Sequence, residues 1–131
     1  MAKASKKTSS KKKVNRVTEN GRVYIAATFN NTLVTITNNK GDTLAWSSAG
    51  ASGFKGTRKS TPYASQVAAE NAMKDASMYG IEKADIYIKG IGVGRDQSLR
   101  GIASSGIDVL SVTDITPVAH GGCRKRKVRR P

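Results

Sequence analysis

The sequence has very little of the chemistry on which disulfides and metal sites depend. Among 131 residues there is one cysteine, Cys123, and one histidine, His120. A single cysteine cannot form a disulfide within the chain, and a reducing cytoplasm is the expected setting. One cysteine and one histidine are also too few ligands for a zinc site built by one chain. We therefore predict no metal centre and no cofactor.

Long hydrophobic runs are also missing. No stretch approaches the length of a transmembrane helix, and the amino terminus lacks the apolar segment of a signal peptide. The basic ends of the chain contain none of the Trp, Phe and Leu residues that an interfacial helix places in a membrane. We therefore expect no membrane partner.

Acidic residues are absent from both ends. The chain has 23 Lys and Arg residues against 9 Asp and Glu, a net charge of +14. Residues 1–16 contain seven of the basic residues and residues 117–131 contain six. Like charges repel and bury nothing, so we expect each end to become ordered only against a polyanion, most commonly nucleic acid. The basic residues expected to bind it are Lys11, Lys12, Lys13, Arg16, Arg124, Lys125, Arg126, Lys127, Arg129 and Arg130.

The remaining body is nearly neutral and long enough for one domain. We predict a basic arm over residues 1–20, a single domain over 21–116 and a second basic arm over 117–131. Aromatic residues make up only 5% of the chain, which argues against binding of single strands by base stacking. Folded RNA, recognised through its phosphates, shape and 2′-hydroxyls, is the favoured partner.

Hydrophobic patterning predicts five strands and two helices. The strands are expected at 22–29, 32–37, 42–47, 84–89 and 107–115, with a helix at about 62–78 and a shorter one after residue 95. Thr61 suits the N-cap of the first helix, and Pro62 suits its first position. The aromatic residues expected in the core are Tyr24, Phe29 and Trp46.

The order of these elements, β-β-β-α-β-α-β, predicts an α/β fold with a five-stranded mixed sheet. Hairpin neighbours are antiparallel, and strands joined through a helix are normally parallel. The second strand should then run against the other four. The Asn30-Asn31 turn, the loops after the third and fourth strands and the carboxyl arm would all emerge at one edge, where open α/β sheets bind ligands.

The segment after the third strand, Gly53–Pro62, carries Lys55, Arg58 and Lys59 and runs into a helix. No acid occurs between Asp42 and Glu70. Its glycines let backbone approach a ligand, and the helix start offers unpaired N–H groups, so the segment predicts an anion site. It is a poor match to a nucleotide P-loop, because Arg58 stands where that motif needs glycine.

The loop after the fourth strand has Gly90, Gly92 and Gly94, followed by Arg95. A dinucleotide-binding motif would need glycine at position 95. Two interpretations remain: a structural turn, or a backbone cradle for an RNA phosphate aided by Arg95 at the helix start. We favour the cradle because Arg100 lies about one turn further along.

Catalysis is poorly supported by the sequence. The acids are scattered, and only Asp96 and Asp114 are expected at the ligand edge, where a metal nuclease would need several. We predict a non-enzymatic protein without a small-molecule substrate. A metal-dependent RNA-processing nuclease on the same fold is the alternative, and a free dinucleotide-binding module is a third class.

Several of these segments together carry a family resemblance: Phe29–Thr32, Gly53–Glu70, the glycine loop with Arg95, and Thr113–Pro117 with His120 and Cys123-Arg124. They resemble the universal small-subunit ribosomal protein eleven, bacterial type, over about residues 21–126. The resemblance implies a ribonuclease-H-like fold without catalytic function. It also implies binding of small-subunit ribosomal RNA at the platform, near the exit site and the messenger RNA path, beside small-subunit proteins seven, eighteen and twenty-one. It adds Asn30, Asn31 and His120 to the candidate RNA-binding residues.

Two departures from the family pattern stand out. Ile91 and Val93 occupy positions at which the family usually carries prolines, which adds two backbone donors and makes the loop less stiff. Gly121 stands where bacterial members often have an asparagine before glycine. An Asn-Gly pair can rearrange to isoaspartate and Gly121 cannot, so we expect no role for that modification here.

Overall fold

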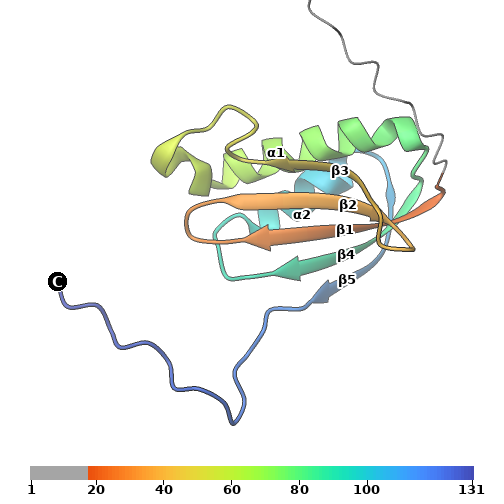
Figure 1. The fold of residues 1–131 in the computed structure, drawn as a ribbon. Coiled ribbons are helices and arrows are strands. Elements are labelled where there is room, and N and C mark those ends of the chain that lie inside the picture. Colours follow the sequence, from red (N-terminus) through yellow and green to blue (C-terminus); the bar gives the residue numbers. More distant parts are fainter. Residues whose placement is uncertain (1–17) are drawn as a thin grey trace, which may run out of the picture.

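The computed structural model describes residues 18–131, which form a five-stranded sheet with helices packed against it (Figure 1). The strands are β1 (Asn20–Ala27), β2 (Thr32–Asn38), β3 (Thr43–Ser48), β4 (Lys83–Lys89) and β5 (Asp108–Asp114). The helices are α1 (Pro62–Ala76) and α2 (Arg95–Ser104), with short 3-10 turns η1 (Gly56–Ser60) and η2 (Ser77–Tyr79). The predicted element order is therefore confirmed.

The sheet has the order β3-β2-β1-β4-β5. Strand β2 is antiparallel to both β1 and β3, whereas β4 is parallel to both β1 and β5. The predicted directions are confirmed, because short four-residue connections, 28–31 and 39–42, join the first three strands and a helix precedes each of the last two. The ends of β1, β3, β4 and β5 consequently share one edge of the sheet.

Both helices lie on the same face of the sheet (Figure 1). Helix α1 packs on β2 and β3, and α2 packs on α1 and contacts β1. Alanines on the buried side of α1 let it approach closely, and aliphatic side chains of the three central strands complete the core. The largest fully buried hydrophobic side chains are Val23, Ile25, Val34, Ile36, Ile86 and Ile102.

Helix α1 begins as expected. The Thr61 hydroxyl accepts a hydrogen bond from the Ala64 amide at 3.4 Å, and Pro62 takes the first helical position. The regular helix ends at Ala76, and η2 continues it to Gly80, whose φ of 73° is the left-handed conformation that glycine favours. The prediction of one helix over 62–78 is confirmed in position, with its last turn tightened to a 3-10 geometry.

The prediction that aromatic residues lie in the core is wrong for two of the three. Trp46 is 62% exposed and Phe29 is 68% exposed, while Tyr24 is half-buried. Strand β1 ends two residues before Phe29, because the Thr28 amide bonds to the Asn31 carbonyl in a turn. Trp46 alternates correctly along β3, but it points to the face that neither helix covers. Alternation separates two faces without saying which face a helix will cover.

Residues 117–131 form no helix or strand and are exposed, and they extend away from the domain (Figure 1). The predicted amino-terminal RNA ligands Lys11, Lys12, Lys13 and Arg16 lie outside the described residues. Within residues 18–131, no helix has the length and apolar character needed to cross a membrane.

Candidate nucleic-acid interface

Segments from distant parts of the sequence meet at the edge where four strands end. We call this edge the rim: the turn 28–31, the basic loop 53–61, the glycine loop 90–94 and the start of the carboxyl arm at 115–117. The Gly92 amide donates to the Ala27 carbonyl, and the Ile115 amide donates to the Ile88 carbonyl. The hydroxyls of Thr32 and Ser65, 2.7 Å apart, join the turn to helix α1. The predicted convergence is confirmed.

The basic loop is held in shape by its own backbone. Turn η1 is closed by the Arg58 amide donating to the Lys55 carbonyl, and the Thr61 hydroxyl donates to the Arg58 carbonyl at 2.7 Å. The side-chain Nδ2 of Asn71 on α1 donates to the Ser52 hydroxyl at 3.0 Å, which ties the residue just before the loop to the helix behind it. Its cations are therefore presented from a structured turn.

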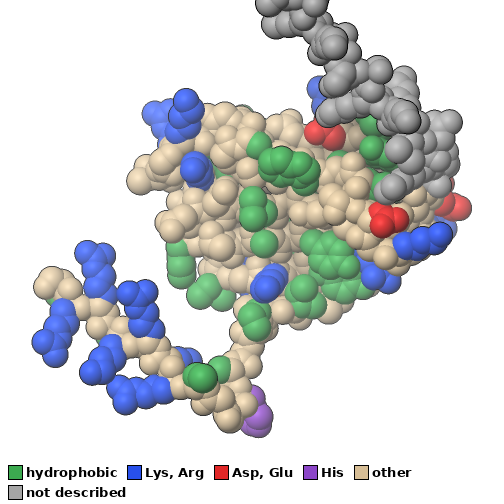
Figure 2. Space-filling model, in the orientation of Figure 1, with side chains coloured by type: hydrophobic (Ala, Val, Ile, Leu, Met, Phe, Trp, Pro, Cys, Tyr) green, Lys and Arg blue, Asp and Glu red, His purple; other side chains and the backbone are tan. Residues whose placement is uncertain are grey.

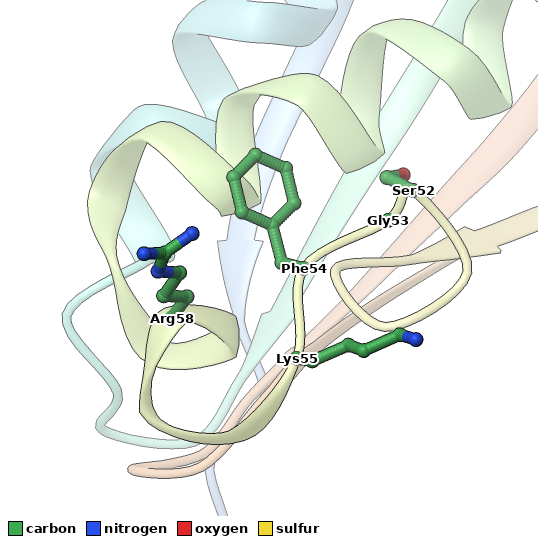
Figure 3. A pocket seen from close by; sticks show the side chains of 5 residues that line it. All are labelled: Ser52, Gly53, Phe54, Lys55 and Arg58. Atoms are coloured by element: carbon green, nitrogen blue, oxygen red, sulfur yellow. The ribbon is translucent and has the colours of Figure 1, made fainter.

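A hollow of about 360 Å³ opens in this loop, lined by residues 52–55 and Arg58 (Figure 3). Lys55 and Arg58 extend in different directions from its two sides. The Phe54 ring meets the Tyr63 ring edge-on with 5.8 Å between centroids, which fixes the floor of the loop against α1. The arrangement offers a shallow surface with a cation on each side, suited to an extended anion.

The charge of the basic loop is not neutralised locally. Within residues 18–131, no ion pair involves Lys55, Arg58 or Lys59. Lys55 and Arg58 are exposed, and the half-buried stem of Lys59 passes beside Gly50. These three side chains therefore present unpaired positive charge at the rim.

The Asn30-Asn31 turn is built around the Thr28 hydroxyl, which donates to the Asn31 carbonyl and accepts from the Asn31 amide at 3.1 Å. The Asn31 side-chain oxygen accepts from the Thr32 amide at 2.8 Å. Asn31 therefore shapes the turn. The Asn30 backbone amide also bonds to the Thr28 hydroxyl, at 3.4 Å, while the exposed Asn30 side chain offers its carboxamide group to a ligand.

The glycine loop does not form the predicted phosphate cradle from Gly90 and Gly92. The Gly90 amide donates to the Thr116 hydroxyl at 3.1 Å, and the Gly92 amide donates to the Ala27 carbonyl at 3.3 Å. A Cβ atom on Gly90 would lie 2.0 Å from the Ala27 oxygen, and one on Gly94 would lie 1.9 Å from the Ser65 hydroxyl. The glycines allow this loop to pack closely on β1 and α1. They therefore form a structural turn, the first of the two interpretations offered by the sequence.

Arg95 is also engaged within the protein. Its guanidinium donates to the Gly90 carbonyl at 2.6 Å and to the Asp114 carboxylate at 2.7 Å. The Asp114 carboxylate also accepts from the hydroxyl and amide of Thr116. Hydrogen bonds from Thr116 and Arg95 hold the pKa of Asp114 well below its usual range. This Arg95–Asp114–Thr116 clasp fixes the point at which the arm leaves the sheet. Sequence reasoning missed it, although Asp114 is one of two acids expected at this edge.

Comparison with known proteins agrees with this geometry. The family model described as ribosomal protein S11 matches residues 21–130. The chain is 54% identical over 123 residues to the small ribosomal subunit protein uS11 of Borreliella burgdorferi, covering 94% of this chain and 95% of that protein. It is 50% identical over 130 residues to uS11 of Saccharophagus degradans, covering 99% of each. The chain belongs to the ribosomal protein S11 family.

As a member of the S11 family, the chain is a structural protein of the small ribosomal subunit in the cytoplasm and not an enzyme. Among the described residues, no three His, Cys, Asp or Glu side chains are grouped to hold a metal ion. Asp114 is bound to Arg95, and Asp96 is exposed in the first turn of α2.

The remaining predicted ligands of this S11-family chain are spread over exposed surface. Arg100 is exposed on α2, and His120 is exposed at the bend of the arm. The six basic residues of 124–130 follow along an extended segment (Figure 2). The structure brings Lys55, Arg58 and Lys59 together on the rim, and it does not gather the residues of the arm into a site.

Proposed function

We propose that this chain binds small-subunit ribosomal RNA at the platform of the subunit, near the exit site and the messenger RNA path. Its neighbours there would be small-subunit proteins seven, eighteen and twenty-one. The family supports a role in the small subunit, and the rim supplies a structured basic surface on which RNA can be held. The observation that carries the proposal is the convergence of unpaired cations at one rim of an otherwise nearly neutral domain.

The mechanism is electrostatic and geometric. The rim orients the domain on folded RNA because Lys55, Arg58 and Lys59 come from a loop that is ordered before binding. The arms then follow the RNA and neutralise phosphates where helices crowd together. Each phosphate contact releases counterions and contributes about −0.7 to −0.9 to the slope of log K against log salt concentration.

The rim and the arms have different roles in this proposal. The residues that contact RNA are Asn30, Lys55, Arg58, Lys59, Arg100, His120, Arg124, Lys125, Arg126, Lys127, Arg129 and Arg130, with Lys11, Lys12, Lys13 and Arg16 in the amino-terminal arm. A second group of residues supports the rim in this proposal without contacting RNA, because these residues shape its turn and its glycine loop. They are Asn31, Gly90, Gly92, Gly94 and Arg95.

The test is competitive reconstitution of small subunits with charge-matched variants. We expect Arg58→Ala with Lys59→Ala to reduce incorporation about tenfold, the effect of losing two partly oriented phosphate contacts. The control is Lys40→Ala with Lys74→Ala, which removes the same charge from exposed positions at the opposite end of the domain. We also expect a smaller loss from Lys6→Ala with Lys7→Ala in the amino-terminal arm.

Equal losses in the rim pair and the Lys40/Lys74 pair would show that only net charge matters and would overturn the role of the rim. A larger loss in the Lys6/Lys7 pair would assign the orienting role to the arm.

A further inference from the structure

Three exposed apolar side chains lie at the rim, where the turn 28–31 meets the glycine loop. Phe29 is 68% exposed, and Ile91 and Val93 are 65% and 62% exposed. A Cβ atom on Gly92 would lie 2.3 Å from the Thr28 carbonyl oxygen, so the glycine loop crosses the turn directly beside Phe29. Residues next to this crossing are within side-chain reach of one another. We call Phe29, Ile91 and Val93 the apolar corner.

Phe29 is carried by a turn whose backbone is already closed. The Thr28 amide donates to the Asn31 carbonyl at 2.9 Å, and the Thr28 hydroxyl accepts from the amides of both Asn30 and Asn31. Among residues 18–131, the Phe29 ring pairs with no other aromatic ring. The turn therefore presents a free ring face, and little backbone entropy is lost when a ligand covers it.

The charge around the apolar corner is mainly positive. The turn, the basic loop and the glycine loop contain no Asp or Glu, and the basic loop carries three unpaired cations. Two acids lie nearby: Asp114 is bonded to Arg95, and Asp96 is exposed in the first turn of α2. The corner thus suits a ligand that combines a flat apolar surface with negative charge. A nucleotide has this combination in its base and its phosphate.

Asn30 adds a group that can bind the edge of a base. Its side chain is exposed and takes no part in the hydrogen bonds of the turn, whereas the Asn31 side-chain oxygen accepts from the Thr32 amide. A carboxamide carries a donor and an acceptor side by side, the pattern that pairs with base edges. Because Asn30 directly follows Phe29, the two side chains can contact the edge and the face of one base.

We propose that the apolar corner receives a single unpaired base of the small-subunit RNA, stacked on the Phe29 ring and bordered by Ile91 and Val93. This inference rests on the proposed function and specifies its RNA: a loop or bulge that turns one base outwards, and not an uninterrupted duplex. One aromatic residue suits one base, whereas proteins that bind single strands stack a run of bases on several.

The first test identifies the base. The chain with p-azidophenylalanine in place of Phe29 is added to small-subunit particles reconstituted without this protein and is then photo-crosslinked. Primer extension maps crosslinks on the RNA, and mass spectrometry identifies crosslinks to proteins. We expect one dominant crosslink, to an unpaired nucleotide that wild-type chain protects from chemical probing. A dominant crosslink to a paired nucleotide or to a protein would overturn the proposal, as would a yield no higher than from position 78, where the exposed Met78 lies on η2.

The second test separates stacking from apolar contact. Phe29→Leu keeps an apolar side chain and removes the ring, whereas Phe29→Tyr keeps the ring. We expect Phe29→Leu to weaken binding to the particles about tenfold and Phe29→Tyr to stay within about twofold of wild type. Both variants should keep the Tm within about 1 °C, because the side chain is exposed. Wild-type affinity of the leucine variant would refute the stacking.

The third test removes the base instead of the ring. An abasic nucleotide at the crosslinked position should weaken binding of the wild-type chain about tenfold and should weaken binding of Phe29→Leu no further. Losses that add would refute the base as the partner of Phe29 and leave the proposed function standing. Failure of the wild-type chain to bind the particles, or binding that Arg58→Ala with Lys59→Ala does not weaken, would refute the proposed function and this inference with it.

Discussion

At the scale of single residues, Asp114 has the most consequential position. One carboxylate oxygen accepts from the Arg95 guanidinium and the other accepts from Thr116. The Thr116 hydroxyl in turn accepts from the Gly90 amide. One side chain thus connects the last strand, the glycine loop and the first residues of the arm. Its hydrogen bonds therefore position the rim.

The clasp predicts a pH-dependent stability. Because hydrogen bonds lower the pKa of folded Asp114, its stabilising effect is complete above about pH 5, where the unfolded carboxyl is also ionised, and is lost as the pH falls towards the folded value. We expect Asp114→Asn to lower the Tm by a few degrees at pH 7 and the difference from wild type to shrink between pH 5 and pH 2. Thermal unfolding followed by circular dichroism measures both.

The matched control for the clasp is Asp75→Asn, at an exposed carboxylate on α1. This change should leave the Tm at pH 7 within about 1 °C of wild type. A difference between Asp114→Asn and wild type that stays constant from pH 7 to pH 2 would contradict the role of the ionised carboxylate.

The contacts of Arg95 and of the glycine loop could not be predicted from the sequence. Arg95 was expected to reach outwards, since nothing in the sequence reveals that Asp114, 19 positions away, faces it. The spacing of Gly90 and Gly92 fits a cradle and a tight crossing equally well. The close approach of the Ala27 carbonyl decides between them, and that approach depends on the pairing of β1 with β4.

At the scale of elements, the junction of η1 and α1 governs the presentation of charge. The Thr61 hydroxyl accepts from the Ala64 amide and donates to the Arg58 carbonyl, so one side chain caps the helix and closes the basic loop. The N-terminus of α1 and its positive dipole end are therefore held next to Arg58 and Lys59.

Removing this cap should weaken both stability and RNA binding. Thr61→Ala is expected to cost about 1 kcal/mol of the free energy of unfolding, the usual value for a lost N-cap. Because the loop loses its closing bond, RNA affinity should also fall a few-fold. Thr61→Ser keeps the hydroxyl and serves as the control, measured by urea unfolding and filter binding. Equal destabilisation by alanine and serine would mean that the methyl group matters and the cap does not.

The elements themselves were largely predictable from the sequence. Strand and helix positions followed from the alternation in β1 and from Thr61-Pro62, and the directions followed from the connections. The side of the sheet covered by the helices did not follow, which is why Trp46 was misplaced. Its exposure depends on how α1 crosses the sheet, and a period of two cannot specify that.

At the scale of the whole molecule, charge is segregated along the strands. The rim and the carboxyl arm carry unpaired cations, whereas Glu19, Glu82 and Asp108 lie at the starts of parallel strands, at the opposite edge. Backbone hydrogen bonds join these three residues in one group. A polyanion that approaches the domain meets unpaired cations at the rim, whereas at the opposite end the acids lie among Lys40, Lys74 and Lys83, which favours binding through the rim.

The carboxyl arm extends this polarity beyond the folded domain, and removing it should change binding without changing stability. Deletion of residues 122–131 removes six basic residues that are exposed and outside every strand and helix of the described chain. The Tm should stay within about 1 °C of wild type, because no buried group is lost. The slope of log K against log salt for RNA binding should become less steep by about 4 to 5, if each residue contacts one phosphate.

A full-length variant with serine at these six positions separates the effect of charge from that of chain length, since it should show the same slope as the deletion. An unchanged slope would mean that the arm does not bind RNA and that the rim alone carries the interaction.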